Sequence, residues 1–461
     1  MLALMGFALI IVFMILLSMK KLSPFVGLIV VASLFGLVAA FVFNDAGVVG
    51  SFKSVFQWIR EGVFYQFDQA GNKVVAGTVN TAALLLFAII YFSLMLNAGM
   101  FDPLCIGLLK SVKGDPLKIT VVTALLSSVV ALDGDGTTTV LIVTAAVLTL
   151  YKKMNMKMTY LAMLIVIPNS ILNFMPWGGP LARVLSVVNL EVTELFPLLM
   201  PGVAAAMVYV FVIAYVMGMS ERKRLGYVKG GKEVISALEI EAIIDEMRNR
   251  DLELKRPKLF YVNVTLSLLI MLALITGVGN GAILFMVGTA VALMINYPKL
   301  KDQAARLRDN GGDAMGPVVV IFAAGALMGI LNGSGMSTAI ADNMIKWIPE
   351  SWGGHIPFLS AFVALPGLIF LSNDAYYFGI LPVISPIAYG FGATPIQMGA
   401  AAMIGQALHF ASPLVAFIYI LIDRCEISFG EYAKEFVKWA WPIFFIYLGM
   451  AVLTGLLPIS V

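Results

Sequence analysis

Residues 133–139 read Asp-Gly-Asp-Gly-Thr-Thr-Thr and interrupt an otherwise apolar part of the chain. The apolar arms on either side, 119–132 and 140–151, are each about a dozen residues long. A helix that crosses a bilayer needs about 20 residues. Two short arms that meet at a polar, glycine-rich tip are typical of a re-entrant hairpin. Irregular backbone at membrane depth is tolerated only where protein or a water-filled cavity surrounds it, so the tip is a candidate site.

The composition predicts an all-α polytopic membrane protein. Of 461 residues, 60% are hydrophobic and 12% are charged, and the mean hydropathy is +0.95. A soluble domain carries about 25% charged residues. The first apolar stretch, 2–18, lacks a small-residue cleavage pattern, so we expect a retained helix and not a signal peptide. The net charge of +3 is small, and no nucleic-acid partner is expected.

Ten membrane crossings are predicted, five on each side of a polar loop at 220–258. They are 2–18, 24–43, 81–97, 160–190 and 196–218, then 259–276, 280–297, 316–331, 398–422 and 439–458. The loop holds ten Lys/Arg against eight Asp/Glu, and the positive-inside rule therefore places it in the cytoplasm. Both termini and the segment 45–80 then lie outside, and 299–308 lies inside. The expected location is a bacterial-type plasma (inner) membrane.

The two halves also resemble each other. The sequence Leu-Asn-Ala-Gly-Met at 96–100 is echoed by Leu-Asn-Gly-Ser-Gly-Met at 331–336, and the hairpin tip 133–139 is matched by a second at 372–376. Because each half has an odd number of crossings, the repeats are inverted, and the two hairpins approach the midplane from opposite sides. We therefore expect a first inverted repeat at 1–219, a cytoplasmic linker at 220–258 and a second repeat at 259–461. Each repeat has five crossings, a re-entrant hairpin and a broken helix.

Aspartates at the tips are predicted to hold a cation. One aspartate at membrane depth costs about 2.5–3.5 kcal/mol on insertion scales, and Asp133 and Asp135 repel each other unless a metal ion or proton lies between them. Asp374 at the second tip repeats this chemistry, and hard oxygen ligands favour Mg²⁺, Ca²⁺ or Mn²⁺. Thr137 and Thr138 follow the first tip at a helix N-terminus, a geometry that binds anions. A surface loop at the membrane boundary is the alternative interpretation.

Two crossings are predicted to break in mid-membrane. In 160–190, three prolines and the pair at 178–179 exclude a continuous helix, so the freed backbone groups need partners. Asn173 and Gly178 there are predicted to line a ligand site, with a structural kink as the alternative. His409 and Ser412 occupy the equivalent break in 398–422. His409 is either a packed histidine or a proton relay or carboxylate donor. Arg183 is left open between a cavity role and an outer-surface position.

These motifs closely resemble the citrate–divalent-metal:proton symporter (CitMHS) family within the ion-transporter superfamily. The stretches that carry the resemblance are 130–139, 176–180 with Arg183, 371–376, and 101–103 through 113–118. The resemblance covers essentially the whole chain. It implies a homodimer with a scaffold domain and an elevator-like transport domain that holds both hairpins and both broken helices. The implied activity is proton-driven uptake of citrate complexed with a divalent cation. Superfamily members carry Ser-Asn-Thr at the tips beside sodium sites, whereas this chain has aspartates there.

The expected cargo is therefore a metal–citrate complex moved together with protons. Neither a prosthetic group nor an enzymatic activity is expected. The predicted metal or proton carriers are Asp133, Asp135 and Asp374. The predicted substrate-binding residues are Thr137, Thr138, Asn173, Gly178, Arg183, Ser372, Asn373, His409 and Ser412. A sodium-coupled di/tricarboxylate transporter is the nearest alternative, and a channel and a membrane-embedded enzyme are more distant ones. The sequence leaves open whether the metal is of the Mg²⁺ or the Ca²⁺ type, because selectivity depends on cavity size and ligand number.

Overall fold

A computed structural model describes residues 1–43, 47–67, 73–75, 77–112, 114–227, 241–242, 244–245, 248–249 and 251–460, but not the side chains of 66, 67, 73–75, 77 and 133. Much of the predicted linker 220–258 thus lies outside the described residues. The all-α class is confirmed, apart from one short hairpin of two antiparallel strands. Among these described residues, seven helices are long and apolar enough to cross a membrane.

The N-terminal half is built mainly of helices. Its elements are α1 (Leu2–Ser18), α2 (Pro24–Val26), η1 (Gly27–Val31), α3 (Ala32–Phe43), α4 (Gly47–Phe64), β1 (Tyr65–Phe67), β2 (Lys73–Val75), α5 (Gly77–Asn97), α6 (Asp102–Lys110), α7 (Pro116–Val130), η2 (Ala131–Asp133), α8 (Gly136–Lys153), α9 (Met158–Leu172), α10 (Gly179–Val188) and α11 (Val192–Arg224). The turn η1 is π-helical and η2 is a 3-10 turn.

The C-terminal half repeats this order. Its elements are η3 (Pro257–Leu259), α13 (Phe260–Ile275), α14 (Gly281–Asn296), α15 (Leu300–Gly333), α16 (Met336–Ile345), α17 (Glu350–Gly353), α18 (Ile356–Phe370), α19 (Asn373–Ala375), η4 (Tyr376–Ile380), α20 (Leu381–Gly390), α21 (Pro395–Ile404), η5 (Gly405–Ala411), α22 (Ala416–Cys425) and α23 (Phe429–Leu453). In both halves a long helix and a short helix precede a hairpin, a broken helix and another long helix. This is the order that the sequence predicts.

Helix α4 lies in the segment 45–80, which was treated as a loop outside the membrane. The loop is a wrong prediction, because 47–64 is helical, and the outer position stays a prediction. The apolar side of α4 packs on α15, where Trp58 fills the space left by the absent side chain of Gly333. Helix α5 begins beside Gly325 and ends where Asn97 donates to Asn310 of α15. Helices α4 and α5 therefore lie one after the other along α15, and both run in the same direction. Because α5 continues in the direction of α4, the chain does not turn back through the membrane between them.

Helix α15 is also longer than predicted. It begins at Leu300, so the segment 299–308, which was predicted to be an inner loop, forms its first turns. Close packing along its other end depends on glycines at every fourth position, Gly325, Gly329 and Gly333. Small residues at this spacing let membrane helices approach closely. The backbone of α4 comes so near that a Cβ at Gly329 would stand 2.0 Å from the Trp58 carbonyl oxygen.

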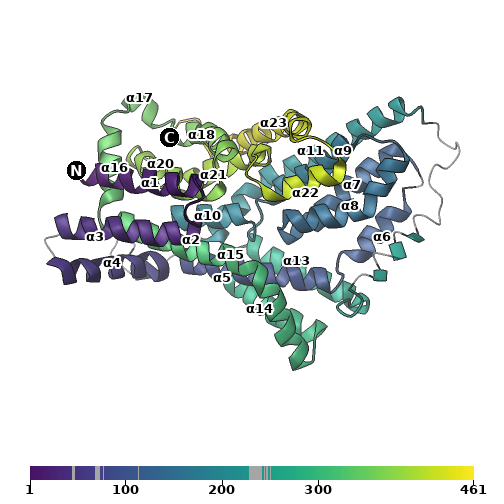
Figure 1. The fold of residues 1–461 in the computed structure, drawn as a ribbon, viewed down its shortest axis with the longest axis horizontal. Helices are drawn as coiled ribbons and strands as arrows, with labels where there is room; N and C mark the ends of the chain where they lie inside the picture. The colour runs from purple at the N-terminus through teal and green to yellow at the C-terminus, as the bar shows by residue number, and fades with distance from the viewer. Residues whose placement is uncertain are drawn as a thin grey trace.

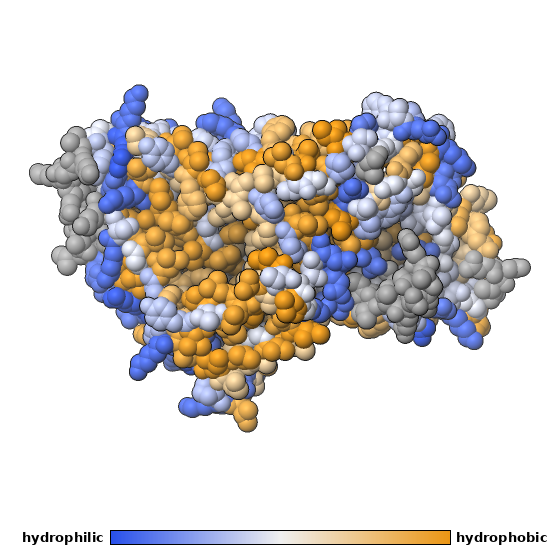
Figure 2. All heavy atoms as spheres, turned by 180° about the vertical axis from the view of Figure 1, so that it is seen from behind, coloured by the Kyte–Doolittle hydropathy of each residue, from blue (hydrophilic) through white to orange (hydrophobic). Residues whose placement is uncertain are grey.

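Several of the segments predicted to be cytoplasmic contact one another. Arg222 Nε donates to Asp115 Oδ1 at 2.8 Å, and Lys152 pairs with Glu426 at 2.5 Å. The first contact joins the end of α11 to the loop after α6, and the second joins the end of α8 to the residue after α22. In Figure 1 both chain ends lie in the left half of the view, whereas α6 lies at the right. Figure 2 shows apolar side chains across the middle of one face, bordered by hydrophilic ones on both sides, as a bilayer-embedded surface requires.

Candidate functional site at the hairpin tips and helix breaks

The first hairpin tip is a tight turn that caps a helix. Gly134 adopts a φ of +82°, which a side chain rarely tolerates. This turn sets Asp135 at the N-cap of α8, where its carboxylate accepts hydrogen bonds from the N–H of Thr137 (3.1 Å) and of Thr138 (2.8 Å). The Thr138 hydroxyl donates to the same carboxylate at 2.6 Å. The groups of Thr137 and Thr138 that were predicted to bind an anion thus already donate to a carboxylate of the protein, that of Asp135. The side chain of Asp133 lies outside the described residues.

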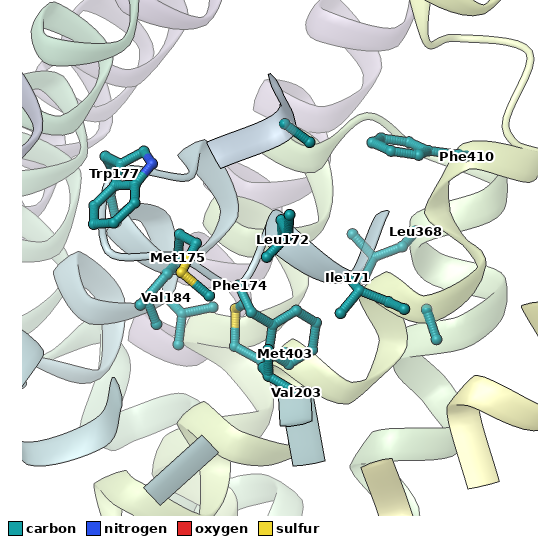
Figure 3. Close-up of a cluster of buried hydrophobic side chains, with 14 of the residues drawn as sticks. Ile171, Leu172, Phe174, Met175, Trp177, Val184, Val203, Leu368, Met403 and Phe410 are labelled. Atoms are coloured by element: carbon teal, nitrogen blue, oxygen red, sulfur yellow. The ribbon is translucent and has the colours of Figure 1, made fainter. Parts of the chain in front are cut away.

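The first broken helix supports this tip. Helix α9 ends at Leu172 and α10 begins at Gly179, so the chain breaks within the predicted stretch. Trp177, in the break, donates from Nε1 to the carbonyl oxygen of Leu132 at 2.7 Å and stacks on Phe92 of α5 with ring centroids 4.0 Å apart. Figure 3 shows Trp177 beside the apolar residues that pack around the break. The indole therefore fixes the tip against both the break and α5.

The second tip is connected to the first repeat by an ion pair. Arg183 of α10 donates from Nε to Asp374 Oδ1 at 2.7 Å, and both side chains are about five-sixths buried (16% and 15% exposed). Of the two positions left open for Arg183, the structure favours the interior one. Its Nη1 lies against Gly179, where a Cβ would stand 2.6 Å away. Asp374 is therefore paired with a cation supplied by the protein itself.

Neighbouring polar groups hold the second tip in place. The Ser372 hydroxyl accepts from the Ala375 N–H at 3.2 Å and caps α19. Gln406, buried in η5, donates from Nε2 to Asn373 Oδ1 at 2.8 Å and to the Tyr377 hydroxyl at 2.7 Å. A π-helical turn, η4, follows the tip directly, and such turns often occur at functional sites.

His409 is satisfied inside the protein. It is 5% exposed, and its Nδ1 lies 2.7 Å from the carbonyl oxygen of Leu368, an acceptor only, so Nδ1 carries the proton. This contact joins the second break to the first arm of the second hairpin. It agrees with the interpretation of His409 as a packed histidine. Ser412, fully buried, accepts from the Leu414 N–H at 3.3 Å.

A cavity of about 480 Å³ lies where the first tip, the first break, α5 and α15 meet. Ligand pockets typically measure about 300–1,000 Å³. From the tip and the break it is lined by Gly134, Asp135, Thr138, Trp177 and Gly179. From α5 and α15 its polar lining is Ser93, Asn97, Asn310 and Asp313. Of the predicted site residues, Asp135 and Thr138 line this cavity, and Arg183 lies directly behind Gly179.

The other predicted residues do not meet at this cavity. Asn173, Gly178, Ser372, Asn373, Asp374, His409 and Ser412 do not line it, nor does Thr137. Within the described part of the chain, no group of three or more histidine, cysteine, aspartate or glutamate side chains is placed to hold a metal ion. The metal role of the three aspartates stays a prediction.

The prediction missed the polar residues of the α5–α15 side. Asn97 was noticed only as part of the repeated sequence, and Asn310 and Asp313 were missed. A signal exists in Gly311-Gly312-Asp313, which places a carboxylate directly after two glycines at the edge of an apolar span. Gln406 was also missed, although it is an amide inside the apolar stretch of the second break.

A second, larger cavity lies at the opposite end of α5. It measures about 730 Å³ and is bordered by α5, α14 and the start of α11. At this point Glu191 accepts from Asn80 Nδ2 (2.9 Å) and from Asn280 Nδ2 (3.0 Å). Glu191 is also the N-cap of α11, where it forms a capping box with Glu194. One carboxylate thus joins three elements.

Comparison with known proteins gives consistent results. Residues 13–405 match the model of a family described as "Citrate transporter". A citrate transporter of Bacillus subtilis (strain 168) is 40% identical over 99% of this chain and 100% of that protein. A Mg(2+)/citrate complex secondary transporter of the same strain is 36% identical over the full length of both chains. Among solved structures, the YdaH transporter of Alcanivorax borkumensis has a TM-score of 0.52, with 12% identity over 89% of this chain and 98% of that one. The last likeness shows the fold alone.

Proposed function

The chain belongs to the citrate transporter family, and we propose that it takes up citrate complexed with a divalent cation by proton symport. The observation that carries the proposal is the 480 Å³ cavity bordered by the first tip, the first break and the α5–α15 pair. It presents carboxylates for a cation and amide and hydroxyl groups for citrate. A 36% identical relative is named as a transporter of the Mg(2+)/citrate complex, which supports a cation of the Mg²⁺ type.

The charge of the cargo favours coupling to protons. Fully ionised citrate with one divalent cation has a net charge of −1, so one proton makes the load neutral. Each further proton makes uptake sensitive to the membrane potential, by about 2.3 kcal/mol per charge per 100 mV. Asp135 and Asp133 are the proposed cation ligands, and Thr138 and Arg183 the proposed contacts for citrate. When a citrate carboxylate takes the guanidinium of Arg183, Asp374 loses its partner and is the proposed proton acceptor.

We propose that Asn173, Gly178, Ser372, Asn373, His409 and Ser412 bind or support the cargo when both tips close around it. The proposed movement is elevator-like, with the hairpins and broken helices sliding against α5 and α15 in a homodimer. The proposed setting is a plasma (inner) membrane with the loop 220–258 in the cytoplasm and both termini outside. The position of both termini in one half of Figure 1 supports placing them on the same side of the membrane.

The test is uptake of labelled citrate into proteoliposomes under an inward proton gradient. The assay contains EDTA, then Mg²⁺, then Ca²⁺, each with and without a protonophore. We expect uptake that requires one of the cations and collapses with the protonophore. Uptake that persists in EDTA and needs sodium would instead indicate a sodium-coupled di/tricarboxylate transporter. Recovery of chemically unchanged citrate from the vesicles would exclude an enzyme. Saturation of the uptake rate with citrate concentration would exclude a channel.

A further inference from the structure

We propose that, in the conformation described here, α15 supplies half of the cargo site, with Asp313 as a ligand of the divalent cation and Asn310 as a donor to citrate. This inference rests on the proposed function and adds residues that lie outside both hairpins and both broken helices. It concerns the wall of the cavity that faces the first tip.

Asp313 is an exposed carboxylate that lines the cavity. Within the described part of the chain it makes no ion pair and no hydrogen bond. One turn earlier on the same helix, Asp309 pairs with Arg306 at 2.9 Å, so Arg306 is already engaged there. Asp135 across the cavity is partly satisfied by the first turn of α8. Asp313 is thus the carboxylate of this cavity with the most capacity to bind a cation.

The backbone around Asp313 offers a second oxygen. Pro317 also lines the cavity and lies inside α15, four residues after Asp313. Proline has no N–H, so the Asp313 carbonyl oxygen lacks its usual partner in the helix. A Cβ at Gly312 or Gly316 would meet nothing within 4 Å, so the space beside this turn is open. A carboxylate and a released carbonyl on one residue suit a hard cation that keeps other ligands from citrate or water.

Asn310 provides independent evidence that a ligand belongs here. Its side chain lines the cavity and is 6% exposed. The Oδ1 atom accepts from Asn97 Nδ2 at 3.0 Å, which leaves the Nδ2 group of Asn310 to donate elsewhere. That Nδ2 has no hydrogen-bond partner. A buried donor without a partner is costly, about 1–3 kcal/mol, and a citrate carboxylate in the cavity would satisfy it.

The two residues lie on one face of α15. Positions 310, 313 and 317 are spaced by three and four residues, which aligns side chains along one side of a helix. The cation and the anion of the cargo would therefore contact the same helix face one turn apart. The metal–citrate complex would in this way be recognised as a unit. Metal alone would leave the Asn310 contact unused, and citrate alone would leave the Asp313 contact unused.

The test is binding of metal–citrate to the full-length protein in detergent, by calorimetry with Mg²⁺–citrate and Ca²⁺–citrate and by electron paramagnetic resonance with Mn²⁺–citrate. Asp313→Asn is expected to weaken binding by about tenfold or more, as for loss of one charged contact, and to change the ratio of Mg²⁺ to Ca²⁺ affinities. Asp309→Asn, one turn away and outside the cavity, is the matched control and is expected to bind like the unmodified protein.

Asn310→Asp tests the donor separately. This variant keeps the acceptor for Asn97 and the side-chain size but replaces the unpartnered N–H with oxygen, so the affinity for metal–citrate should fall while the unfolding midpoint stays the same. If the unmodified protein binds metal–citrate and Asp313→Asn binds it equally well with unchanged metal preference, the inference is wrong. If the unmodified protein binds no metal–citrate at all, it is the proposed function that fails.

Discussion

Arg183 and Asp374 lie 191 residues apart in the sequence and form an ion pair of 2.7 Å between the first broken helix and the tip of the second hairpin. Each residue comes from a different half of the chain. At membrane depth either charge alone is costly, whereas the pair is neutral. The contact therefore stabilises the junction of the two halves, and it borders the cavity through Gly179.

Removing one partner should destabilise the protein more than removing both. Arg183→Gln or Asp374→Asn leaves a mostly buried charge, a change that costs about 3–5 kcal/mol in fully buried pairs. The double variant leaves two neutral groups, so its unfolding midpoint in detergent should recover most of the loss. Citrate uptake should not recover, because Arg183 is also proposed to bind a carboxylate. A double variant that transports normally would show that the pair is structural only.

The hydrogen bond from Trp177 to the first tip should affect the affinity for citrate. Trp177→Phe keeps an aromatic ring beside Phe92 but removes the donor to the Leu132 carbonyl oxygen. A buried acceptor left without its partner costs about 1–3 kcal/mol, so we expect a lower unfolding midpoint and a higher KM for citrate uptake. Trp352→Phe, on an exposed residue of α17, is the control and should change neither quantity. An unchanged KM for Trp177→Phe would show that this hydrogen bond does not affect citrate binding.

Gly329 should tolerate no side chain. In Gly329→Ala the new Cβ would meet the Trp58 carbonyl oxygen at 2.0 Å, so α4 and α15 must move apart. Overpacking of this kind typically costs about 1–3 kcal/mol. Thermal unfolding in detergent should show a lower midpoint. The matched control is Gly449→Ala in α23, where a Cβ meets nothing within 4 Å and the midpoint should stay equal or rise slightly. Equal midpoints for both variants would contradict the packing of α4 on α15.

Asp115 should make stability depend on pH at the end of the molecule predicted to be cytoplasmic. Burial raises the pKa of its carboxyl, but the hydrogen bonds and charge of Arg222 and the Leu117 N–H outweigh burial, so the pKa lies below the ordinary value. A depressed pKa stabilises the fold above the unfolded value of about 3.9, and this contribution disappears as the pH falls through the folded value.

The measurement for Asp115 is the unfolding midpoint between pH 7 and pH 3. Asp115→Asn should be less stable than the unmodified protein at pH 7, and the difference should shrink toward pH 3. Asp342→Asn, on an exposed carboxylate of α16, should show no such convergence. A difference for Asp115→Asn that is constant with pH would mean that its charge does not contribute.

The hairpins and breaks could be predicted because they depend on local properties. Arms too short to cross a membrane, glycines at the first tip and prolines inside 160–190 each act within a few residues of chain. Helix α4 could not be found in the same way, since Lys53, Arg60 and Glu61 lower its apolar character and its helical face depends on α15. Its packing surface, the glycines of α15, is more than 250 residues away in the sequence.

The site was predicted in parts for the same reason. The position of Asp135 at a tip follows from its neighbours, but its role as a helix cap depends on the φ of Gly134 and the path of the following turn. Asp374 was predicted to be a metal ligand because the sequence does not reveal that Arg183 reaches it. Asp313 was missed because the glycines before it mark an unusual position but do not show what faces it, and only the fold brings it to the cavity of the first tip.

The carboxylate of Glu191 holds three helices together at one end of α5. It accepts hydrogen bonds from Asn80 of α5 and Asn280 at the start of α14, so any movement of α11 away from these helices must replace both. Because a hydrogen bond to a charged group contributes about 1.5–3 kcal/mol, this junction resists separation at the end of α5 that lies opposite the Asp135 cavity.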